Sequence, residues 1–115
     1  MPRVLLLFLI LMLEACSTAR KSFVLPENAP GGWHLKETTH EGSKTVGIYE
    51  GPGKVTVEVE DVGQQAVAFE RAQKTRSQPD SVFFDKDRYF VTVRWDQADR
   101  EALKMLVRAL QKQQL

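Results

Sequence analysis

The sequence predicts an α+β fold: an antiparallel sheet of about five strands with two helices, in the order β-β-β-α-β-β-α. Two observations lead to this prediction. Runs rich in β-branched residues alternate with a period of two and are separated by turn-forming residues, which indicates hairpins. Two later segments instead repeat apolar residues at the spacing of a helix face. Strands and helices are therefore expected in separate parts of one small domain.

The first three strands are expected in residues 33–37, 45–50 and 54–60. The third alternates most clearly, because valines at 55, 57 and 59 share one side and polar residues the other. Residues 40–44 predict a turn, and the Gly-Pro-Gly sequence at 51–53 predicts a hairpin. One-sided alternation of this kind is typical of an antiparallel sheet with one face in water.

The first helix is expected over residues 61–76. Asp61 would cap its first free N–H groups while Gln64 reaches back, as in a capping box. The apolar face of this helix would consist of Ala66, Phe69 and Ala72.

A second hairpin is expected over residues 81–95, with its turn at 85–87. Its second strand carries aromatic residues on both faces, which indicates a central strand. The last helix is expected over residues 97–113, with Asp96 as its cap. Its core-facing stripe would be Leu103, Leu106, Val107 and Leu110.

The N-terminal residues 1–15 are expected to be a signal peptide. Arg3 precedes an apolar run of about ten residues, whereas a membrane-spanning helix needs roughly twenty. The sequence Leu13-Glu14-Ala15-Cys16 then resembles the lipobox of bacterial lipoproteins, although Glu14 occupies a position that usually holds a small or apolar residue. The resemblance implies cleavage before Cys16, a thioether-linked diacylglycerol on its sulfur and an acyl group such as palmitate on its amine. Such a set of acyl chains exceeds the roughly two signals that stable membrane anchoring needs.

The lipobox resemblance also implies a location. Ser17 stands where enteric lipoproteins retained at the inner membrane have aspartate, so the protein is expected at the outer membrane, facing the periplasm. Residues 16–32 would form the lipidated N-terminus and a flexible tether, and residues 33–115 the domain. The alternative is ordinary secretion with cleavage at Ser17-Thr18-Ala19. Cys16 is the only cysteine, so no disulfide is expected.

A second resemblance covers the later part of the chain. Ala66-Val67-Ala68-Phe69, the apolar hairpin that ends in Tyr89-Phe90-Val91-Thr92-Val93, and the amphipathic last helix resemble a bacterial family of small, uncharacterised envelope lipoproteins. Asp87 stands where the family pattern has a turn glycine. Because the family has no assigned activity, the resemblance implies a fold and a location but no reaction.

Composition and motifs argue against several classes of function. The net charge of +1 lacks the clustered basic excess of nucleic-acid binders. No serine lies in a Gly-x-Ser-x-Gly motif. His34 and His40, near two glutamates, are the candidate metal ligands, without the His-Glu-x-x-His spacing. The candidate paired carboxylates, all expected at the solvated surface, are Glu58, Glu60, Asp61, Asp85 and Asp87. We therefore expect no catalytic residue, no metal and no cofactor.

Two surfaces are the remaining candidates for binding. Basic residues recur every four positions on the last helix, where they would meet anionic headgroups or form a solvated face: Arg100, Lys104, Arg108 and Lys112. Three aromatic residues would line a groove or belong to the core: Trp33, Tyr49 and Phe90.

The favoured function is a lipid-anchored envelope protein whose domain is a non-enzymatic module that binds an envelope protein partner. One alternative is a small secreted or envelope metal-dependent hydrolase that uses His34 and His40. Another is a structural accessory of a larger complex.

Overall fold

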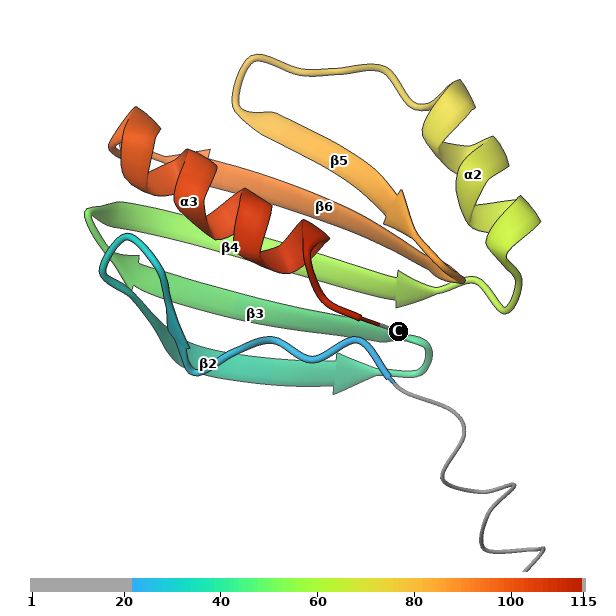
Figure 1. Cartoon of the computed structure of the whole chain (residues 1–115), viewed down its shortest axis with the longest axis horizontal. Coiled ribbons are helices and arrows are strands. Elements are labelled where there is room, and N and C mark those ends of the chain that lie inside the picture. The colour runs from blue at the N-terminus through green and yellow to red at the C-terminus, as the bar shows by residue number, and fades with distance from the viewer. Residues whose placement is uncertain (1–21, 115) are drawn as a thin grey trace, which may run out of the picture.

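The computed structural model describes residues 22–114, so the predicted signal peptide and lipobox lie outside the described residues. Six antiparallel strands form one sheet in the order β1-β2-β3-β4-β6-β5, with α3 across one of its faces (Figure 1). The strands are β1 (Asn28–Ala29), β2 (Trp33–Glu41), β3 (Lys44–Gly51), β4 (Gly53–Asp61), β5 (Ser81–Lys86) and β6 (Tyr89–Asp96). The helices are α2 (Gln65–Lys74) and α3 (Arg100–Gln111). The α+β prediction is confirmed, with β1 as an additional short strand.

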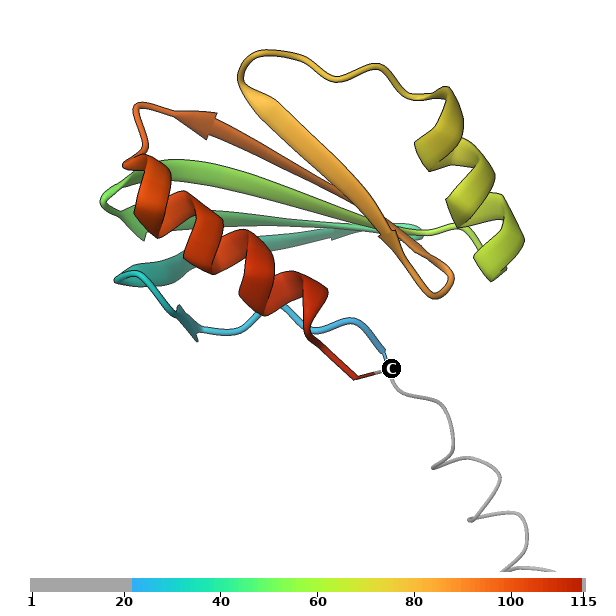
Figure 2. The ribbon, with the colours of Figure 1, turned by 45° about the horizontal axis from the view of Figure 1, so that its top comes forward.

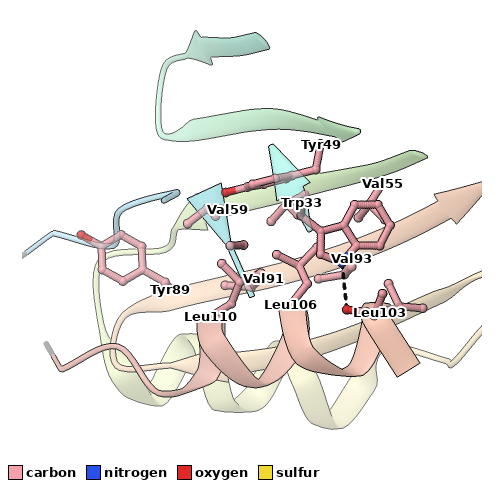
Figure 3. Close-up of a cluster of buried hydrophobic side chains, with 13 residues drawn as sticks. Trp33, Tyr49, Val55, Val59, Tyr89, Val91, Val93, Leu103, Leu106 and Leu110 are labelled. Carbon is pink, nitrogen blue, oxygen red and sulfur yellow. Dashed lines mark hydrogen bonds between the residues drawn. The ribbon is translucent and has the colours of Figure 1, made fainter. Parts of the chain in front are cut away.

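The core lies between α3 and the sheet (Figure 3). The predicted stripe of α3 is confirmed, since Leu106 and Leu110 are fully buried and Leu103 nearly so. The predicted alternation of β4 is confirmed too, because Val55, Val57 and Val59 are buried against this helix. Each such aliphatic side chain contributes about 1.5–3 kcal/mol when it leaves water. This layer of aliphatic residues holds helix and sheet together.

A buried hydrogen bond fixes the position of α3 on the sheet. The Trp33 indole Nε1 at the start of β2 donates to the carbonyl oxygen of Ala102 at 2.8 Å (Figure 3). Ala102 lies in the first turn of α3, where Asp99 caps the helix by accepting from the Ala102 N–H at 2.9 Å. The helix start is therefore anchored to a strand that lies far from it in the sequence.

The turn between β3 and β4 packs against two other connections. A Cβ atom on Gly51 would clash with the carbonyl of Gly32, and one on Gly53, which has a φ of 148°, would clash with the carbonyl of Gln97. The Asp99 N–H also donates to the Pro52 carbonyl at 3.0 Å. The two glycines are thus required by close backbone contact, which holds the end of the sheet against the start of α3.

Part of the predicted tether packs on the domain. Phe23 and Leu25 lie against the core, and the Phe23 ring is 5.8 Å from that of Tyr89. The Tyr49 hydroxyl donates to the Pro26 carbonyl at 2.7 Å, and burial raises the pKa of this phenol far above its ordinary value. Residues 23–26 therefore pack on the domain, ahead of the expected boundary at Trp33, because their apolar side chains reach the core.

The helix α2 packs on the opposite face of the sheet, near β5 and β6. Phe90 points away from the α3 side, and the Arg71 guanidinium of α2 lies 5.7 Å from its ring centre. The predicted apolar face of α2 is wrong: Ala68 is the buried residue, whereas Phe69 is 54% exposed. The small alanine lets the helix backbone approach the sheet closely, while the larger side chain stays outside.

Several predicted boundaries are shifted. Asp61 belongs to β4 and accepts the Gly63 N–H at 2.9 Å, so it does not cap α2, which has no side-chain cap at Gln64. β2 continues to Glu41, beyond the expected turn. The last helix starts at Arg100 instead of 97, capped by Asp99 and not by Asp96. The second strand of the second hairpin, β6, was predicted to be central, and this is confirmed because β6 lies between β4 and β5.

We predict that Trp33→Phe lowers the free energy of unfolding by about 2 kcal/mol, because it removes the buried hydrogen bond to Ala102 and part of the indole volume. Urea unfolding followed by circular dichroism measures this loss. Trp95→Phe is the control, since Trp95 is only half-buried, and it should cost clearly less. Equal costs for the two variants would contradict the anchoring role of Trp33.

Candidate functional site

The three aromatic residues that the sequence offered as a groove belong to the interior. Trp33 and Tyr49 are completely buried in the α3 core. Phe90 is buried under α2 on the other face, with its ring centre 5.7 Å from that of Phe83. Of the two roles considered for them, groove lining and core, the structure shows the core, and all three stabilise the fold.

The basic residues of the last helix are exposed, as expected. Arg100, Lys104 and Arg108 lie on the outer side of α3, and Lys112 follows as its C-terminal cap residue. Lys104 pairs with Glu101 at 3.4 Å, an exposed contact within one helical turn. Among residues 22–114, Arg108 has no carboxylate within ion-pair distance. Two of these side chains, Lys104 and Arg108, also border a hollow beside the helix.

This hollow, the β5–α3 groove, lies between the edge strand β5 and α3. It has a volume of about 320 Å³, and its lining is mainly apolar: Val82, Phe84, Leu103 and Val107, with Lys104 and Arg108 on its rim. Val82 remains 38% exposed although it faces the same side as the buried Val93. The views from two angles show why, since α3 lies over β3, β4 and β6 and leaves β5 beside it uncovered (Figures 1 and 2).

The sequence did not single out the apolar residues of this groove. Val82 and Phe84 alternate on β5, and Val107 was assigned to the core-facing stripe of α3. Nothing in their spacing indicates that the helix stops short of the edge strand. The one signal in the sequence is that Val107 widens the α3 stripe beyond its leucines, and in the structure Val107 is only partly buried.

The two histidines are not brought together. His34 faces the side of the sheet that α3 does not cover, and its Nδ1 lies 2.7 Å from the Asn28 Oδ1. His40 is paired with Thr45 at the far end of β2, where its Nδ1 lies 3.1 Å from the hydroxyl oxygen. Within residues 22–114, no group of three or more His, Cys, Asp or Glu residues is arranged to hold a metal ion.

Three of the five candidate carboxylates, Glu60, Asp61 and Asp87, are held in ion pairs at the surface. Glu60 pairs with Arg71 of α2. Arg88 pairs with Asp61 at 3.0 Å and lies 3.9 Å from Asp87. Partial burial of Asp61 raises its pKa, but hydrogen bonds from the Gly63 N–H and from Arg88 outweigh this effect and lower the pKa below its ordinary value. These pairs connect the end of β4 to α2 and to the β5–β6 turn, which is a structural role.

Comparison with known protein families, curated proteins and solved structures found no match to this chain. The resemblance to small envelope lipoproteins thus remains a prediction from the quoted residues. Among the described residues, no helix has the length and apolar content needed to cross a membrane.

We predict that Asp61→Asn lowers stability at neutral pH and makes stability less sensitive to acid. Because the pKa of Asp61 is lower in the folded state, its ionised form stabilises the fold above its ordinary pKa of 3.8. That contribution disappears as the pH falls through the lowered value. The difference between wild type and variant should therefore be constant near neutrality and shrink below about pH 4.

Urea unfolding between pH 2 and pH 7 measures this dependence, with Asp96→Asn, at the exposed end of β6, as the control. Parallel pH profiles for wild type and Asp61→Asn would show that the Asp61–Arg88 pair contributes nothing.

Proposed function

We propose that this protein is a lipid-anchored component of the bacterial cell envelope, attached through Cys16 to the outer membrane and facing the periplasm, and that its domain binds a protein partner without catalysing a reaction. The observation that carries the proposal is the sequence Leu13-Glu14-Ala15-Cys16 directly after a short apolar run. The use of the chain's only cysteine at this position supports it.

The packing of Phe23 on the core, seven residues after Cys16, supports anchoring close to the membrane. Residues 17–21 separate Cys16 from Ser22, the first residue that the structure describes. An extended chain spans at most about 3.5 Å per residue, so this link reaches no farther than about 20 Å. The Val24 N–H donates to the Gln113 side chain at 3.0 Å, so the first described residues lie beside the C-terminal end of α3. That end of the domain would therefore face the lipid surface.

The arrangement of polar side chains favours binding over catalysis. General acid–base chemistry needs titratable groups in unlike environments around one cavity. Here the histidines bond to Asn28 and Thr45 at separate places, and the acidic residues Glu60 and Asp61 pair with arginines at the surface. The mainly apolar β5–α3 groove is lined by basic side chains and by no histidine or carboxylate. Among the described residues, no group of side chains has the arrangement that the metal-dependent alternative needs.

We predict that the protein isolated from the membranes of its host has the mass of residues 16–115 plus a diacylglycerol and an acyl group. Cys16→Ala removes the sulfur that would carry the lipid, so this variant should keep residues 1–15 and show the unmodified mass of 13.1 kDa. Intact-mass spectrometry of the membrane fraction measures both species.

Ser17→Ala serves as the matched control, because it changes the neighbouring residue and keeps the sulfur. It should be lipidated like the wild type. A wild-type mass that begins at Ser17 or later and carries no lipid would contradict the anchor and make the protein a secreted one.

A further inference from the structure

The outer edge of β5 has backbone groups without a strand partner. Trp95 N donates to the Asp80 carbonyl at 3.0 Å, which makes these two residues a hydrogen-bonded pair of the β5–β6 ladder. Such pairs alternate along antiparallel strands, so Val82 and Phe84 bond to β6 while Phe83 and Asp85 direct their N–H and C=O groups outward. Within residues 22–114, the sheet ends at this edge.

The strand β5 contributes both the unpaired edge of the sheet and one side of the β5–α3 groove. Val82 and Phe84 turn their side chains to the α3 side, where they form one wall and part of the floor of the groove. An extended chain that adds to a sheet edge forms main-chain hydrogen bonds there and places every second side chain on the same face. Its side chains on the α3 side would stand over the groove.

We propose that the β5–α3 groove binds an extended, acidic segment of a partner protein, added to the sheet as a strand beside β5. The main chain of this segment would bond to Phe83 and Asp85, and its alternate apolar side chains would enter the hollow of about 320 Å³. The proposal specifies the partner surface of the binding module and rests on that proposed function. It does not depend on the lipid anchor.

The charge of the rim determines the chemistry of the partner. Lys104 and Arg108 lie along the α3 side of the groove. Within residues 22–114, the one carboxylate that pairs with either of them is Glu101, which pairs with Lys104. Asp85 turns to the opposite face, since it is aligned with Phe90. An aspartate or glutamate in the bound segment would therefore meet two basic side chains, only one of which is already paired with a carboxylate, and charge complementarity of this kind selects the partner.

A second copy of the chain fits this surface less well. Antiparallel pairing of β5 with itself around Phe83 would align Asp80 with Lys86 of the other copy and Val82 with Phe84. The two-fold axis of such a pair is perpendicular to the sheet, so both α3 helices would lie on the same side. The two grooves would then face each other unfilled, with Lys104 and Arg108 of both copies around one cavity. An acidic segment instead fills the groove and neutralises its rim.

This proposal can be tested by phage display. A random dodecapeptide library is selected for binding to the mature protein, purified in mild detergent. We expect the selected peptides to combine alternating apolar residues with an excess of aspartate and glutamate. Synthetic copies of the strongest binders should bind at least tenfold more weakly to Val82→Lys, which places a charge in the groove. Val67→Lys is the matched control, because Val67 is similarly exposed, at 42%, but lies on α2. It should bind like the wild type.

The rim is tested in the same assay. The double variant Lys104→Glu and Arg108→Glu should weaken binding of the acidic peptides at least tenfold, whereas Arg100→Glu, on the same helix outside the groove, should change it less than twofold. Circular dichroism verifies that each variant is folded. An unfolded Val82→Lys protein would be replaced by Val82→Thr, for which a smaller loss in the same direction is expected.

Three results would overturn the proposal. The selection could yield no binders. It could instead yield binders whose affinity is the same for Val82→Lys and Val67→Lys, which would place binding elsewhere on the domain and leave the proposed binding function intact. Sedimentation could instead show a dimer that Val82→Lys dissociates, which would assign the edge to a second copy. If protein isolated from its host carried no lipid but bound through the groove, the anchor alone would be contradicted and this proposal would stand.

Discussion

The hydrogen bond from the Trp33 indole to the Ala102 carbonyl determines where α3 lies, and the rest of the exposed surface follows from that position. A helix of 12 residues is about 18 Å long and about 10 Å wide, which is the width of roughly two strands spaced 4.8 Å apart. It cannot cover a six-stranded sheet. Residues 23–29 cover another part of the same face, where Leu25 and Phe23 reach the core and the Phe23 ring lies near Tyr89 of β6. β5 is left uncovered on this face.

The elements with strong periodicity were predictable from the sequence. The alternation of Val55, Val57 and Val59 and the leucine stripe of α3 each specify one buried face, and the structure confirms both. The helix α2 was predictable as a helix but not in its orientation. Its buried residue is Ala68, because close approach to the sheet requires a small side chain there, whereas a pattern of hydrophobicity selects the larger Phe69. The sequence also did not distinguish Asp96 from Asp99 as the cap of α3. Gln97 adopts a φ of 51°, which is not helical, so α3 starts only at Arg100.

The candidate groove depended on tertiary geometry that no local pattern contains. Val82 and Val107 lie on different elements, and their exposure depends on the distance that α3 keeps from the edge of the sheet. The aromatic residues that looked suitable for binding, such as Trp33, are instead needed to hold α3 in place. The basic spacing on α3 predicted an exposed stripe, but only the fold shows that Lys104 and Arg108 stand beside a hollow. Two of the rim residues were thus predictable from the sequence, whereas the groove itself was not.

The central claim is that the outer edge of β5 is unpaired and open to a partner. Amide hydrogen exchange of the free monomer, measured residue by residue by NMR, tests it most directly. The account predicts alternating protection, with slow exchange at Val82 and Phe84, which bond to β6, and exchange at least tenfold faster at Phe83 and Asp85. Equally slow exchange at all four amides would show that another segment already occupies the edge, and the account would be wrong.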